Sequence, residues 1–114
     1  MTVTSPVMEA TKCGFKNRYD NFIGGKWVEP VGGEYFENIT PVTGKTLCEV
    51  ARSSSLDVEK ALDAAHAAKD AWGRTSVTQR SNILHKIAER IEENAEMLAV
   101  AEAIDLCLSR DAAK

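Results

Sequence analysis

The sequence contains only three prolines, and it has no long apolar run. Its three cysteines, Cys13, Cys48 and Cys107, are odd in number and match no zinc-ligand spacing, which argues against a disulfide framework and a zinc site. No stretch approaches the roughly 18 apolar residues of a membrane helix. The N-terminus lacks the basic start and apolar core of a secretory signal. These absences predict a cytoplasmic protein without a membrane partner.

A strong excess of charge of one sign is also missing. The formal net charge is -3, and no cluster of lysine and arginine is long enough to bind a phosphate backbone or an anionic membrane. We therefore expect no nucleic-acid partner. What is present is ordinary for a globular chain: 44% hydrophobic and 27% charged residues over 114 positions, enough for one small domain with its own core.

The strongest pattern is an amphipathic helix predicted over residues 76–105. Its apolar positions recur at three- and four-residue steps, and the opposite face is charged. Ser76 and Gln79 have the spacing of a capping box. The apolar positions are Ile83, Leu84, Ile87, Ala88, Ile91, Ala95, Leu98 and Ala99.

A second helix is predicted over residues 54–73, with Ser54 and Asp57 as its capping pair and Gly73 as a left-handed cap at its end. Its apolar stripe is rich in alanine, which permits close helix packing. Because the link between the two helices is short, we expect them to lie side by side and roughly antiparallel.

Short antiparallel strands are predicted between residues 19 and 53. Paired glycines, Gly24-Gly25, separate two apolar segments and indicate a two-residue hairpin turn, since glycine adopts positive φ without steric cost. Residues 1–18 are polar and show no helical or strand periodicity. This pattern indicates a mobile tail or an arm that docks on a partner. Residues 106–114 predict a second tail. The expected strands are 21–23, 26–28, 35–39 and 46–51.

No set of residues forms a complete catalytic or phosphate-binding constellation. Cys107 lies near a helix C-terminus, which disfavours a thiolate, and Cys48 lies in a strand as a small packing residue. His66 and His85 fall on solvated helix faces without metal-ligand partners. The run Glu89, Glu92, Glu93 and Glu96 is interleaved with Lys86 and Arg90, which is typical of a solvated face rather than an acid–base site.

Four stretches, in this order, resemble the N-terminal part of the NAD(P)-dependent aldehyde dehydrogenase family: YDNFIGGKWVEP, GEYFENITPVTGKTLCEVARSS, DVEKALDAAHAAKDAW and TSVTQRSNILHKIAERIEEN. The resemblance covers about residues 19–102 and is nearest to bacterial enzymes for acetaldehyde and other short aliphatic aldehydes. It implies an α/β fragment, in which short antiparallel strands precede two packed helices, as in the N-terminal part of the family's cofactor-binding domain. Residues 19–114 would form this partial domain.

The family oxidises aldehydes to acids. A cysteine thiolate attacks the aldehyde, hydride passes to NAD or NADP, and a glutamate activates the water that hydrolyses the thioester. This chain departs from the family's typical sequence pattern at Glu102-Ala103-Ile104-Asp105. It contains neither the nucleophile motif nor the cofactor-binding loops. We therefore expect no catalytic residue and no bound cofactor in this chain itself.

One minor site follows from the resemblance alone. Some members of the family bind a monovalent cation through two backbone carbonyls before the Pro-x-Thr-Gly turn and an aspartate after the long helix. The matching positions are Asn38, Ile39 and Asp105. Oxygen ligands of this kind suit hard cations.

Two hypotheses of function follow. The first is an aldehyde dehydrogenase fragment from a truncated or frame-shifted gene, inactive alone, which binds the remaining domains or subunits and self-associates through exposed helix faces. The second is a small non-catalytic module that docks on a full-length relative or another subunit.

Overall fold

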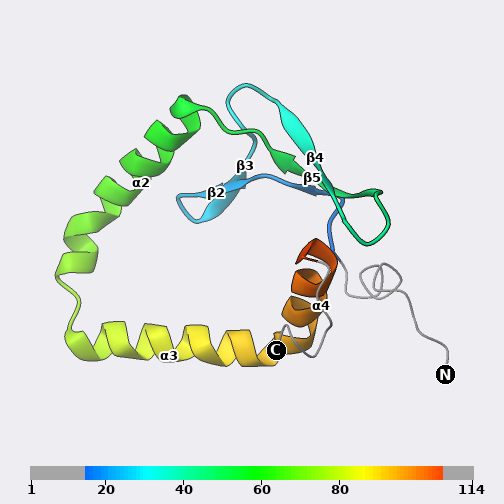
Figure 1. The fold of residues 1–114 in the computed structure, drawn as a ribbon. Coiled ribbons are helices and arrows are strands. Elements are labelled where there is room, and N and C mark those ends of the chain that lie inside the picture. The colour runs from blue at the N-terminus through cyan, green and yellow to red at the C-terminus, as the bar shows by residue number, and fades with distance from the viewer. Residues whose placement is uncertain (1–14, 107–114) are drawn as a thin grey trace.

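The computed structural model describes residues 15–106; the predicted tail residues 1–14 and 107–114 lie outside this range. The α/β class is confirmed, but residues 15–106 contain three helices where two were predicted. The elements are β1 (Arg18–Tyr19), β2 (Asn21–Ile23), β3 (Lys26–Val28), β4 (Tyr35–Ile39), β5 (Thr46–Ala51), α2 (Ser55–Gly73), α3 (Val77–Glu93) and α4 (Ala95–Leu106) (Figure 1).

The β2–β3 hairpin forms as predicted. Asn21 pairs with Val28 and Ile23 with Lys26 in antiparallel register. The turn residues Gly24 and Gly25 have φ values of 61° and 79°. Two consecutive positive φ angles define the type I′ turn that matches the twist of a hairpin, and this geometry explains the glycine pair.

The second sheet has the strand order β1-β5-β4. Strands β4 and β5 are antiparallel as expected, but β1 is parallel to β5, with Arg18 opposite Glu49. The predicted strands pair antiparallel as expected, and the parallel strand β1 is one that was not predicted. The predicted tail 1–18 therefore extends too far. Arg18 belongs to the sheet and forms an ion pair of 2.6 Å with Glu49, while Phe15 packs against the core.

The core lies between α4 and this sheet. Val100 and Ile104 form its centre, and Phe15 and Leu47 pack against them. Asn38 faces Cys48 while Ile39 faces Thr46, so Leu47 is an extra residue without a partner on β4. Such a bulge re-aims the bulged side chain, and here Leu47 packs against α4. Burying these side chains gives this corner its stability.

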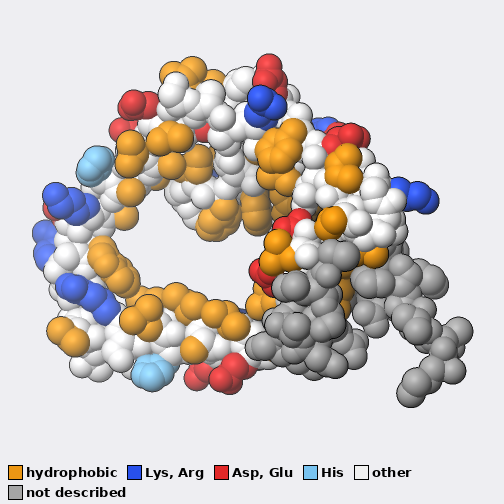
Figure 2. Space-filling view, viewed as in Figure 1, with side chains coloured by type: hydrophobic (Ala, Val, Ile, Leu, Met, Phe, Trp, Pro, Cys, Tyr) orange, Lys and Arg blue, Asp and Glu red, His pale blue; other side chains and the backbone are white. Residues whose placement is uncertain are grey.

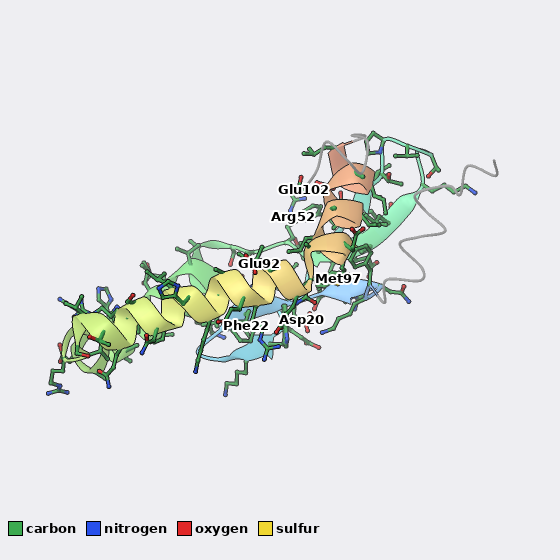
Figure 3. The ribbon with its side chains drawn as sticks, turned by 90° about the horizontal axis from the view of Figure 1, so that it is seen from below. Asp20, Phe22, Arg52, Glu92, Met97 and Glu102 are labelled. Carbon is green, nitrogen blue, oxygen red and sulfur yellow. The ribbon has the colours of Figure 1, made fainter. Side chains whose placement is uncertain are left out.

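The single helix predicted over residues 76–105 was wrong, because it breaks at Asn94. The Asn94 side chain donates a 2.8 Å hydrogen bond to the Arg90 carbonyl and so caps α3. The chain then turns into α4, which brings the apolar face of α4 onto the sheet. Viewed from below, α3 runs as a separate arm away from α4, where Met97 and Glu102 lie (Figure 3).

The corner between α2 and α3 also differs from the prediction. Gly73 has no positive φ and remains helical, and Arg74 is the C-cap with φ -84°. Arg80 closes the corner: its guanidinium donates to the Gly73 carbonyl at 3.2 Å and to the Thr75 carbonyl at 3.0 Å. The two helices extend in different directions from this corner and do not lie side by side (Figure 1).

The elements surround an opening, with α2, α3, α4 and the sheets on its sides (Figure 1). The radius of gyration is 17.7 Å, whereas a compact chain of this length has about 13 Å. No residue of α3 is buried. Within the described part of the chain, no helix has the length and apolar character needed to cross a membrane.

Candidate functional site

The predicted cation positions meet where β4 ends and α4 ends. Asn38 donates a hydrogen bond from Nδ2 to Asp105 Oδ1 at 3.1 Å. Next to them, Thr40 is buried, and its hydroxyl donates to the Ile104 carbonyl at 2.8 Å. Residues far apart in the sequence are thus joined by side-chain hydrogen bonds, which position the last turn of α4 over the sheet.

A cleft of about 460 Å³ opens beside this junction, between β1, β5 and α4. Cys48 lines it. Partial burial raises the pKa of the Cys48 thiol, and the negative charge of Asp105 raises it further. A thiol with a raised pKa is a poor nucleophile. This environment agrees with the packing role predicted for Cys48. Cys13 and Cys107 lie outside the described residues.

The donor set at Asn38, Ile39 and Asp105 fits a cation only in part. The register shift between Asn38 and Ile39 interrupts the β4–β5 ladder, and Asp105 adds an exposed carboxylate. However, the Asn38 side-chain N–H already occupies Asp105 Oδ1, the carboxylate oxygen that a cation would need. The monovalent cation site therefore stays a prediction.

The remaining titratable candidates lie apart. His66 and His85 are exposed on α2 and α3. Among residues 15–106, no group of three or more histidine, cysteine, aspartate or glutamate side chains is arranged to hold a metal ion. Glu93 forms an exposed ion pair of 3.0 Å with Arg90, as expected for a solvated helix face.

The start of α2 is capped by the carboxylate of Asp57. Asp57 accepts hydrogen bonds from the backbone N–H of Ser54 and of Val31, each at 2.8 Å. These bonds, that of Ser54 first, lower the pKa of Asp57. Asp57 thus serves as a capping residue at the start of α2. At the start of α3, Ser76 and Gln79 form a capping box.

Large hydrophobic side chains are exposed on both α2 and α3. The exposed fractions of Leu84 on α3 and Leu62 on α2 are 67% and 50%, although both lie on predicted core faces. Figure 2 shows hydrophobic side chains along the inner edges of both helices, facing the opening. We define the apolar stripes of α2 and α3 as the following exposed large hydrophobic residues of the two helices: Leu62, Trp72, Leu84, Ile87 and Ile91.

Two features of the surface were not predicted as such. Trp27 and Trp72 are about half exposed, and Trp27 packs edge-on against Phe22, with ring centroids 5.2 Å apart. The amide nitrogen of Asn21 is buried without a hydrogen-bond partner. Nothing in the local sequence marks Asn21, because the burial arises from the approach of β2 to α2.

The family model for the aldehyde dehydrogenase family matches residues 27–114. The chain therefore belongs to the aldehyde dehydrogenase family. It is 68% identical over 91 residues to an aldehyde dehydrogenase of Deinococcus radiodurans, covering 80% of this chain and 18% of that protein. It is 56% identical over 105 residues to an acetaldehyde dehydrogenase of Pseudomonas aeruginosa, covering 92% of this chain and 21% of that protein.

A solved structure supports the same assignment. The NAD-dependent aldehyde dehydrogenase from Sinorhizobium meliloti superimposes with a TM-score of 0.81 at 30% identity, covering 90% of this chain and 21% of that one. The described arrangement of strands and helices is thus the arrangement of the corresponding part of an aldehyde dehydrogenase. The chain spans about a fifth of the length of the relatives it matches.

Proposed function

We propose that this chain is the N-terminal scaffold of an NAD(P)-dependent aldehyde dehydrogenase that oxidises a short aliphatic aldehyde to its acid. The observation that carries the proposal is the exposure of the apolar stripes of α2 and α3. Such stripes evolve to be buried. Since relatives have about five times the matched length, the remaining polypeptide is the natural partner for these faces.

In this proposal, the chain positions other domains and does none of the chemistry. Cofactor and catalytic groups come from polypeptide beyond the matched fifth, in agreement with the raised pKa of Cys48. NAD or NADP, when bound there, would accept the hydride. Alone, the chain would be inactive and would self-associate through the apolar stripes.

Complementation tests this function. The chain is co-expressed with the part of the Deinococcus radiodurans relative that follows the matched segment, and NAD-dependent oxidation of acetaldehyde is measured. We expect no turnover by either part alone and measurable turnover by the pair. Turnover by the purified 114-residue chain alone would contradict the proposal, as would an inactive pair.

A second candidate is a binding module that docks on a full-length relative. The buried core between α4 and the sheet favours it, because this corner has a folded centre of its own. A pull-down of purified full-length relative on the tagged chain tests it, with a Leu84→Glu variant as control. Equal recovery on both baits, or none on either, would rule out docking through α3.

A further inference from the structure

One side chain ties the end of α2 to the start of α3. Arg80 donates from Nη2 to the carbonyls of Gly73 and Thr75 at 3.2 and 3.0 Å, and from Nε to the Thr75 hydroxyl oxygen at 3.1 Å. That hydroxyl in turn donates to the Trp72 carbonyl at 2.6 Å. A planar guanidinium group can bind several acceptors in a fixed geometry. Arg80 therefore restrains the whole link between the two helices.

The backbone of the link does not supply the usual helix end. The last carbonyls of a helix need partners, and a glycine with positive φ often provides them through a backbone turn. Here Gly73 has no positive φ, and Arg74 is the C-cap with φ -84°. The Gly73 carbonyl accepts its hydrogen bond from the Arg80 side chain instead. This contact also places a positive charge at the C-terminus of α2, where it is favourable.

Packing does not hold the angle between the two helices. No residue of α3 is buried, and the buried residue of α2, Asp57, lies in its first turn, far from the link. Within residues 15–106, no ion pair joins α2 to α3. The start of α2 is bonded to the turn after β3 and α4 packs on the sheet, so α3 spans two anchored helices. The angle at the link therefore depends on the hydrogen bonds of Arg80.

We propose that Arg80 is a positioning residue for assembly, which holds α2 and α3 at the angle where hydrophobic side chains of both helices face the same opening (Figure 2). One partner can then contact both helices at once. The inference rests on the proposed function, which supplies that partner, the remaining aldehyde dehydrogenase polypeptide. If the angle varied, only the fraction of chains with the correct angle would bind, and assembly would fall with that fraction.

The angle is measured on the 114-residue chain itself. Spin labels at Asp63→Cys on α2 and Glu89→Cys on α3, both exposed positions, report the distance between the helices by double electron–electron resonance. The three native cysteines are replaced by alanine, and the labelled chain is diluted with unlabelled chain. Arg80→Met keeps the apolar stem but removes every donor, so it should broaden the distance distribution. Arg74→Met should not, because Arg74 is an exposed arginine of the same link whose side chain makes no hydrogen bond in the described residues.

Competition measures the effect on assembly. The part of the Deinococcus radiodurans relative that follows the matched segment is co-expressed with the wild-type chain and one variant, each with a different tag, and the two bound chains are quantified. Arg80→Met should be bound about 3- to 10-fold less than the wild-type chain. Arg74→Met, the matched control, should stay within about twofold.

The dissociation rate of the captured complex separates positioning from direct contact. The Arg80→Met complex should dissociate at the wild-type rate, because the partner holds both helices once it is bound. Faster dissociation would identify a direct contact between Arg80 and the partner and would overturn the inference. A wild-type distance distribution in Arg80→Met would overturn it as well.

A second variant separates positioning from folding. Arg80→Lys keeps the charge but cannot donate to the link as a planar fork. Its helix content and thermal midpoint, measured by circular dichroism, should stay near those of the wild-type chain while its binding in competition falls. A loss of helix content as large as the loss of binding would contradict the inference, as would wild-type binding of both Arg80 variants. In that last case the wild-type complex still forms and the proposed function stands, whereas failure of the wild-type chain to form any complex would refute the proposed function itself.

Discussion

Several apolar side chains of α4 are buried, whereas those of α3 are exposed. On α4, Val100 and Ile104 are 5% and 0% exposed and pack against the sheet. On α3, Ile87 and Ile91 follow the same helical spacing, yet they are 50% and 54% exposed. The difference teaches that periodicity identifies the face that will be buried, whereas the presence of a partner decides whether burial occurs within the same chain.

The largest expected difference between these regions is in the cost of truncation. Ile104→Ala should lower the free energy of unfolding by about 2–5 kcal/mol, because it leaves a cavity in the core. Ile87→Ala makes the same chemical change on α3 and should cost less than about 1 kcal/mol, since the side chain is already half in water. Urea unfolding of the full chain measures both.

If Ile104→Ala does not fold, Ile104→Val gives a smaller step of about 0.5–1.5 kcal/mol in the same comparison. Equal losses at positions 104 and 87 would mean that α3 is buried in solution, by a second copy or by another part of the chain, and the contrast between the two helices would fail.

The next effect concerns the buried hydrogen bond at the packed corner. Thr40→Val keeps the shape of the side chain but leaves the Ile104 carbonyl without its donor, and it should cost about 1–3 kcal/mol. Thr78→Val on exposed α3 should be nearly neutral. Urea unfolding compares them, and a neutral Thr40→Val would show that water reaches this carbonyl.

Asp57 connects the start of α2 to the turn after β3, because its carboxylate accepts hydrogen bonds from the backbone N–H groups of Ser54 and Val31. Its folded pKa is lowered from 3.8. The contribution of Asp57 is therefore fully present above the unfolded pKa and is lost as the pH falls through the lower folded pKa. Thermal midpoints measured below pH 4 should fall more steeply for the wild-type chain than for Asp57→Asn.

Asp63→Asn, an exposed change on the same helix, is the control for this pH dependence and should follow the wild-type curve. If Asp57→Asn loses stability with acid as steeply as the wild-type chain, the link through Asp57 is not what holds α2 in place.

The smallest expected effect is a change in the pKa of Tyr35, which is measured by absorbance. Tyr35 on β4 donates a 2.6 Å hydrogen bond to Asp20, which connects β1 to β2, and this bond raises the pKa of Tyr35 from 10.0 to about 12. Its stabilising contribution is present below pH 10 and is lost as the pH rises through about 12. In an absorbance titration, Asp20→Asn should lower this pKa.

Tyr35→Phe assigns the tyrosinate signal in that titration. An unchanged titration curve in Asp20→Asn would show that the Tyr35–Asp20 hydrogen bond does not persist in solution, and that the two sheets are held together by other contacts.

The local structure was predictable where a short stretch determines it. The turn at Gly24-Gly25 and the cap at Ser76 depend on neighbouring residues, and both form as predicted. The break at Asn94 was missed because apolar spacing continues through it, although an asparagine that can cap a carbonyl was a signal. The parallel pairing of Arg18 with Glu49 joins residues that are distant in sequence, and no local pattern encodes it.

The candidate sites show the same limit. The resemblance led to Asn38 and Asp105, and the structure brings their side chains into contact. The unpaired amide of Asn21 was invisible, because it depends on how β2 meets α2. Spacing along one element can be read from the sequence, whereas contacts between elements require the fold.

The Arg80 corner has a consequence for assembly. A flexible link between α2 and α3 would have to lose its conformational entropy when a partner fills the opening, at a cost of about 1–2 kcal/mol for each backbone residue that becomes fixed. The guanidinium bonds to the Gly73 and Thr75 carbonyls fix that angle beforehand. The opening is thus preorganised, and more of the energy gained by burying the apolar stripes remains as net affinity.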